Sequence, residues 1–148
     1  MIPERASLEF YDEKYIEDVI FNVRRNGRKS GYLVNLEGTL KYAWSDNISF
    51  HIYLYEFLHN EYRPTFVELH FEKFCQLIKD KLIGKALNNA GLTKCPLTPK
   101  RYVLSNMSMP FDNFHYIWPF EKARGDGIFI FNKTVIAKGS LYMRFLKN

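Results

Sequence analysis

Residues 128–145 read IFIFNKTVIAKGSLYMRF, and this stretch does most to decide the fold because it holds two runs rich in strand-forming residues. We expect strands at 128–137 and 141–146 that pair antiparallel within the main sheet. The run IFIF is too apolar to be exposed on both faces, so the pair should belong first of all to the core. The side chains expected to be buried are Ile130, Leu141, Met143 and Phe145.

The same stretch also presents a candidate contact surface. Side chains alternate along a strand, so Tyr142 and Arg144 are expected to face outward, near Lys133 and Lys138 in the adjoining segment. A tyrosine flanked by cations can stack on a nucleic-acid base while the cations bind phosphate. These four residues are therefore candidates for binding nucleic acid or another partner.

Parts of this stretch resemble the two sheet signatures of the RNA-recognition motif family. IFIFN is similar to the shorter signature, and KGSLYMRF is similar to the longer one through Lys138, Gly139, Tyr142, Met143 and Phe145. In that family, aromatic side chains on two neighbouring strands stack on bases. A helix and a further strand separate the two signatures there, whereas about five residues separate them here. We therefore do not assign the chain to the family.

A second basic group lies in the segment RRNGRK, at residues 24–29. The cations of this segment could cap the C-terminal end of a helix, but the last two lie too far along the chain to be required for capping. Contact with phosphate is the functional interpretation. The residues concerned are Arg24, Arg25, Arg28 and Lys29.

Charge is distributed unevenly along the 148 residues, whose net charge is +5. Residues 1–80 hold 13 acidic and 10 basic side chains, whereas residues 81–148 hold 3 acidic and 11 basic ones. Positive charge concentrated in one half of a chain is typical of proteins that meet a polyanion or an acidic partner.

Length and composition predict a single globular domain over residues 1–148. Hydrophobic residues make up 47% of the chain, which is too many for a disordered protein. No apolar run is long enough to span a membrane, and the N-terminus lacks the apolar core of a signal peptide, so we expect a soluble cytoplasmic protein. In such a setting Cys75 and Cys95 are expected to be reduced thiols.

The expected fold class is α+β, with an antiparallel sheet packed against two main helices. Apolar residues at Ile16, Val19, Ile20 and Val23 have helical spacing and predict a helix from Asp12 to about Gly27. A second helix is expected to begin at the Thr65–Glu68 capping box and to run to about Asn89, with Gly91 as its stop. Strands are expected at 32–36, 39–45, 48–55, 101–105 and 114–118, the first two forming a hairpin around Glu37 and Gly38.

Catalytic chemistry has weak support in this sequence. No zinc-ligand spacing or nucleotide-binding glycine pattern occurs, so we expect no metal and no cofactor. The outward face of the 48–55 strand carries the best candidates for a small, metal-independent ribonuclease that uses histidine as acid and base. They are His51 and Tyr53, with His59 nearby and Lys41 to hold phosphate. His70, which lies among apolar residues, is expected to be a hydrogen-bonded core residue.

The function expected from these features is a non-catalytic binding protein that engages RNA, DNA or a ribonucleoprotein through its basic C-terminal half. One alternative is an inhibitor from a phage or mobile element that docks on an acidic protein surface. The other alternative is the ribonuclease. The abundance of Asn, Lys, Ile, Phe and Tyr fits a phage or a low-GC bacterium as the source. The sequence leaves the identity of the partner and the oligomeric state undetermined.

Overall fold

The computed structural model of the chain describes residues 2–25, 31–81, 83–107 and 121–145. Strands dominate it and form two antiparallel sheets. The five-stranded sheet has the order β1 (Ile2–Tyr11), β8 (Thr134–Arg144), β7 (Lys122–Phe131), β4 (Ile48–Leu58) and β5 (Glu61–Phe71). The three-stranded sheet has the order β2 (Ile16–Arg25), β3 (Tyr32–Leu40) and β6 (Arg101–Met107).

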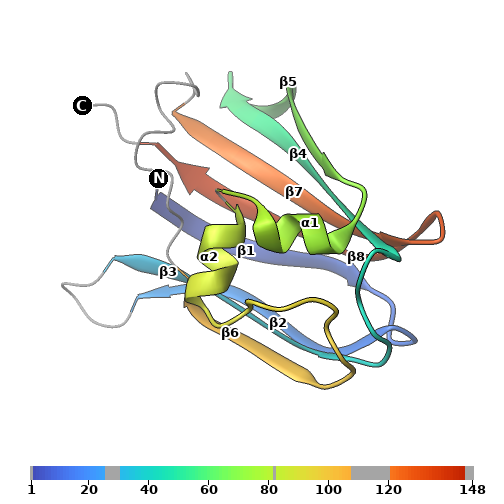
Figure 1. Cartoon of the computed structure of the whole chain (residues 1–148). Coiled ribbons are helices and arrows are strands. Elements are labelled where there is room, and N and C mark those ends of the chain that lie inside the picture. The colour runs from blue at the N-terminus through green and yellow to red at the C-terminus, as the bar shows by residue number, and fades with distance from the viewer. Residues whose placement is uncertain (1, 26–30, 82, 108–120, 146–148) are drawn as a thin grey trace.

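Two short helices link the outer strands of the two sheets. The sheets come together where β1 adjoins β2, and their outer edges, β5 and β6, lie on the other side. There α1 (Phe74–Lys79) contacts β4 and β5, while α2 (Ile83–Asn89) contacts β6, so the helices connect the two sheets (Figure 1). The expected α+β class with an antiparallel sheet is confirmed, but the emphasis on two main helices is wrong, because the fold is mostly β. No helix in the described ranges is long and apolar enough to cross a membrane.

The first expected helix is wrong, because that segment forms β2. Asp18 has φ of 50° and lies in a register shift between Glu17 and Ile20, which is a bulge in the β2–β3 pairing. Beyond the bulge, Val19, Phe21 and Val23 alternate inward, whereas Ile20 is 44% exposed. The bulge adds one residue to the period of two, and this produces an apolar spacing that resembles a helix.

The second expected helix is also wrong over its first half, where β5 forms instead. The Thr65 hydroxyl donates to the Leu54 carbonyl at 2.8 Å and accepts from the Val67 amide at 3.1 Å, so it braces a strand pair rather than capping a helix. Helical structure begins only at Phe74. The expected stop is confirmed, since Gly91 has φ of 104° two residues after the end of α2, a conformation that favours glycine.

The two expected hairpins have different outcomes. The first is wrong, because β3 runs without interruption through Glu37 and Gly38. The second is confirmed in that β7 and β8 pair antiparallel, but the turn falls earlier, at Asn132 and Lys133, which both have positive φ. Met143 and Phe145 are buried at 8% and 5% exposure. The other two expected core residues, Ile130 and Leu141, are half-buried.

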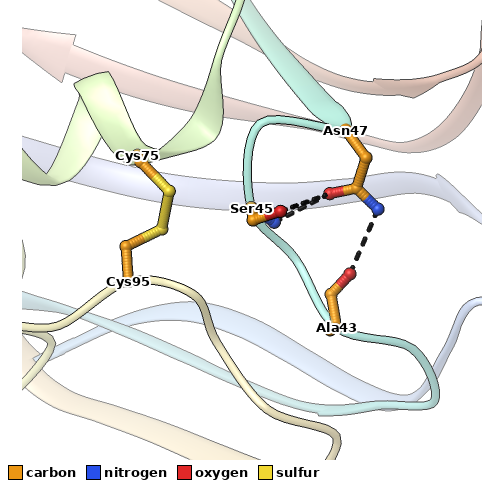
Figure 2. The surroundings of a disulfide bond; sticks show 5 residues. All are labelled: Ala43, Ser45, Asn47, Cys75 and Cys95. Atoms are coloured by element: carbon orange, nitrogen blue, oxygen red, sulfur yellow. Dashed lines mark hydrogen bonds between the residues drawn. A yellow bond between two sulfur atoms is a disulfide. The ribbon is translucent and has the colours of Figure 1, made fainter.

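Cys75 and Cys95 form a disulfide, so the expectation of reduced thiols is wrong. Their Cα atoms lie 5.7 Å apart, and the bond joins α1 to the loop that leads to β6 (Figure 2). The same loop pairs with Trp44, whose amide and carbonyl bond Leu97 at 2.9 and 2.8 Å. The turn that follows Trp44 is braced by Asn47, which accepts from Ser45 and donates to the Ala43 carbonyl (Figure 2). The helices are thereby fixed to both sheets.

Candidate ligand cavity and outer face of the five-stranded sheet

A cavity of about 400 Å³ lies between the two sheets. Its walls come from the inward-facing residues of both sheets and from the helices, and they are almost entirely apolar. On β4 the lining residues are Phe50, Ile52 and Leu54, and the opposite wall includes Phe21, Leu36 and Leu104. The volume is more than twice that of an engineered cavity of about 150 Å³ that binds benzene in another protein.

Glycines on the inner face of β7 and β8 let side chains of the cavity wall lie directly over the backbone. Gly125 and Gly127 alternate with outward-facing residues on β7, and Gly139 lies opposite Gly127 on β8. A Cβ atom at Gly125 would lie 3.1 Å from Leu54 Cδ2, and one at Gly127 would lie 3.0 Å from Phe50 Cε1. Any larger side chain at these positions would project among the residues that line the cavity.

The cavity reaches toward the edge of the large sheet. Leu69 on β5 lines the cavity and is 37% exposed, although it is a large apolar residue. Few polar residues contribute to the walls, and they are Glu37, Asp80 and Lys138. An apolar molecule could therefore enter beside β5.

One row of side chains across the outer face of the same sheet is polar and tightly paired. Arg5, Tyr142, Arg124 and Tyr55 lie side by side across four strands. The Arg5 guanidinium lies 3.9 Å from the centre of the Tyr142 ring, and Arg124 lies 4.3 Å from that of Tyr55. Tyr62 packs edge-on against Tyr142 at 5.4 Å. Such cation–π contacts stabilise the cations while they hold the rings in fixed positions.

A buried acid lies beside this row. Asp126 is 5% exposed, and its carboxylate accepts two hydrogen bonds from Arg124 at 2.9 and 3.2 Å and one from Ser140 at 2.7 Å. Burial acts to lower the pKa of Arg124, but the charge of Asp126 and its hydrogen bond outweigh burial and raise the pKa above its usual value. Arg124 is therefore fixed as a cation.

The expected basic residues do not form one surface. The β7–β8 turn carries Lys133 at one end of the large sheet, while Arg144 lies at the other end of β8, opposite Lys122. The end of β2 that carries Arg24 and Arg25 lies far from that turn, at the left of Figure 1. Arg25 lies 5.4 Å from the centre of the Tyr32 ring. Arg28 and Lys29 lie outside the described residues.

Tyr142 and Arg144 do face outward as expected, but their expected neighbours are wrong. Lys138 lies opposite Ile128, several residues from Tyr142 along β8, and Lys133 lies further away in the turn. The cations beside Tyr142 are Arg5 and Arg124. Sequence reasoning missed both, and spacing along the chain offers no signal for them, since they become neighbours of Tyr142 only through strand pairing.

The candidate catalytic residues converge only in part. His51 and Tyr53 share the outer face of β4, with Tyr53 Oη 3.5 Å from His51 Nδ1. His59 lies in the β4–β5 turn at the far end of that strand. Lys41 forms an ion pair with Glu17, whose hydrogen bond raises the pKa of this lysine. His70 is exposed and lies 3.1 Å from Glu68, so its expected core position is wrong.

No model of a known protein family matches the chain, and no curated protein sequence matches it either. The functional argument therefore depends on the geometry of the molecule.

Proposed function

We propose that this protein binds a small apolar molecule in the cavity between its two sheets. The observation that carries the proposal is the cavity itself, with a volume of about 400 Å³ and walls that are almost entirely apolar. Binding sites for small molecules in proteins have volumes of about 300–1,000 Å³, are mostly apolar and hold a few polar groups that orient the ligand.

The apolar walls support an apolar occupant. They offer water few hydrogen bonds, so water would be held weakly in this space. An apolar ligand would bury the exposed parts of the walls and gain contacts with them.

The shape and chemistry of the walls indicate a lipid-like ligand with an apolar body and at most one polar end. Leu69, the exposed lining residue of β5, marks a route by which such a ligand would enter.

The experiment is a titration of delipidated protein with cis-parinaric acid, a fatty acid whose fluorescence rises in apolar surroundings. We expect a saturable rise with one site per chain. Gly125→Leu, which forces a larger side chain against the lining residues Leu54 and Met143, should weaken binding about ten-fold or more, equivalent to at least about 1.4 kcal/mol. Thr134→Leu adds a similar side chain at an exposed position outside the cavity, and should bind as the wild type does.

The outcomes distinguish binding in the cavity from binding at the protein surface. Saturable binding that Gly125→Leu removes and Thr134→Leu retains would support the proposal, provided that circular dichroism shows both variants folded. Absence of saturable binding to the wild type, or equal binding by all three proteins, would contradict it.

A second candidate function is contact with a polyanion, the partner expected from the sequence. Lys122 and Arg144 are directly opposite each other on β7 and β8, and both are exposed. Like charges in this position destabilise a sheet unless an anion lies between them. Nucleic acid or an acidic protein surface would supply that anion, so this end of the outer face, rather than the β7–β8 turn, is where we place the contact.

The disulfide bears on where the protein works. Disulfides persist in oxidising compartments and are rare in the cytosol, so the Cys75–Cys95 bond favours an oxidising compartment over the cytoplasm expected from the sequence. Counting free thiols in protein purified from its natural source under alkylating conditions tests this. We expect no reactive thiol before reduction and two afterwards, because the chain has two cysteines.

A further inference from the structure

Two histidines form a direct cross-strand pair on the outer face of the five-stranded sheet. His51 of β4 lies opposite His70 of β5 in the register, and the centres of their rings are 4.3 Å apart. Residues directly opposite each other in an antiparallel pair point to the same face. The sheet thus presents two imidazoles side by side near its β5 edge.

A carboxylate completes the group. Glu72 follows β5 directly, and its Oε1 atom lies 3.3 Å from His51 Nε2. One ligand atom from each of His51, His70 and Glu72 can be chosen so that all three lie within 4.8 Å of one another. Ligands of a tetrahedral zinc ion, bound at about 2.0–2.1 Å, lie about 3.4 Å apart, so modest rotations of these side chains would bring the three atoms around one ion.

His51 carries a nitrogen without a hydrogen bond. Its Nε2 atom is buried, and among the described residues it has no hydrogen-bond partner, since Glu72 is near but not aligned. A buried polar atom left in this state costs free energy, and bonding to a metal ion would satisfy it. The other nitrogen, Nδ1, lies 3.5 Å from the Tyr53 hydroxyl oxygen. When Nε2 binds a metal, Nδ1 carries the proton and donates it to that oxygen.

The second histidine also has a supporting partner. Glu68 Oε2 lies 3.1 Å from His70 Nε2, and Glu68 is opposite Tyr53 in the register. Carboxylates beside metal-binding imidazoles hold the ring in position and increase its basicity. Both histidines are therefore oriented by a neighbouring side chain on the same face.

We propose that His51, His70 and Glu72 bind a divalent transition-metal ion, with Zn²⁺ as the best match to two imidazoles and one carboxylate. Three protein ligands leave a coordination position open for water or an anion. The sequence predicts no metal site, because these three residues follow no zinc-ligand spacing along the chain. The pairing of β4 with β5 brings them together. The site lies on the opposite face of β4 from the cavity, since Phe50 and Ile52, on either side of His51, point inward.

The test is titration of metal-free protein with Zn²⁺ by calorimetry, together with the visible absorption spectrum of the Co²⁺ form. We expect one ion per chain and the spectrum of a tetrahedral site. Glu72→Gln changes an exposed side chain and should leave the fold intact, while weakening binding about ten-fold or more. His51→Ala should weaken it at least as much. His59→Asn is the matched control, because it removes an exposed histidine at the far end of β4.

Loss of binding in Glu72→Gln and His51→Ala, with normal binding in His59→Asn, would support the site. Failure of the folded wild type to bind Zn²⁺, undiminished binding by both site variants, or equal weakening by His59→Asn would overturn it. The result is independent of the apolar ligand, because Gly125→Leu should bind Zn²⁺ as the wild type does.

Discussion

The two faces of the five-stranded sheet are built from the same strands but have opposite characters. On β4, Phe50, Ile52 and Leu54 line the cavity, whereas His51, Tyr53 and Tyr55 lie on the outer face. The inner face is apolar and lines a cavity. The outer face carries a row of paired arginine and tyrosine side chains and a pair of histidines. Alternation along a strand thus allows one sheet to hold an open apolar site and a closely paired polar surface.

The largest expected effect is the difference in the free energy of unfolding between two variants at neighbouring residues, one directed inward and one outward. Phe145 is 5% exposed and packs with Leu54 and Met143, so Phe145→Ala should lower the free energy of unfolding by about 3–5 kcal/mol. Arg144 is exposed, and Arg144→Ala should change it by less than about 0.5 kcal/mol. Urea denaturation measures both values. Similar losses in the two variants would mean that the faces do not differ as described.

The disulfide should stabilise the part of the cavity wall that the helices form. Cys75 and Cys95 are separated by 20 residues, and closing a loop of that length contributes roughly 3 kcal/mol through the unfolded state. Cys75→Ser with Cys95→Ser should lower the free energy of unfolding by about that amount and weaken binding of the apolar probe. Reducing agent should destabilise the wild type but leave the double variant unchanged. If reducing agent changed the stability of both proteins equally, the result would contradict the presence of the Cys75–Cys95 disulfide.

The buried acid of the outer face should matter less, but measurably. Asp126→Asn keeps the shape of the side chain and removes its charge, leaving Arg124 without its ion pair. We expect a loss of about 1–3 kcal/mol in the free energy of unfolding. Because an arginine guanidinium keeps its proton in proteins, Arg124 stays charged in the variant, and raising the pH within the folded range should not restore stability. Thermal unfolding at two pH values checks the prediction, and a loss below about 0.5 kcal/mol would contradict it.

The smallest effect concerns the outer face as a binding surface. If a polyanion binds beside Lys122, Arg144→Ala should weaken binding of an RNA or DNA oligonucleotide and reduce the slope of its salt dependence by about 1. Lys133→Ala, in the distant turn, is the matched control and should leave that slope unchanged. Equal changes in both variants would place the contact elsewhere, and no binding at low salt would remove the polyanion proposal.

The sequence predicted part of the fold well. Strict alternation over 48–55 correctly indicated β4, because nothing in that segment interrupts the period of two. The same reasoning failed over β2, where the bulge at Asp18 shifts the apolar positions into a helical spacing. It failed again at Thr65, whose hydroxyl bonds a neighbouring strand that sequence reasoning did not place beside it.

The candidate sites were harder to predict, because they depend on pairing between distant segments. His51 and Tyr53 were recognised on one strand, but His70 and Glu72 join them only through the β4–β5 register. The cavity is lined in part by glycines at 125, 127 and 139, which in the sequence indicate only flexible or close-packed backbone. The disulfide partners were visible as residues, yet their pairing depends on how the helices contact the loop before β6.

The central claim is that the inner face of the five-stranded sheet holds an apolar ligand, and nuclear Overhauser effects between a bound fatty acid and methyl-labelled protein test it most directly. We predict contacts from the ligand chain to Leu54, Leu104 and Met143, which line the cavity. Val135, which is 40% exposed and is not among the lining residues, should show none. Contacts confined to exposed methyl groups such as those of Val135, with none to the three lining residues, would contradict the account.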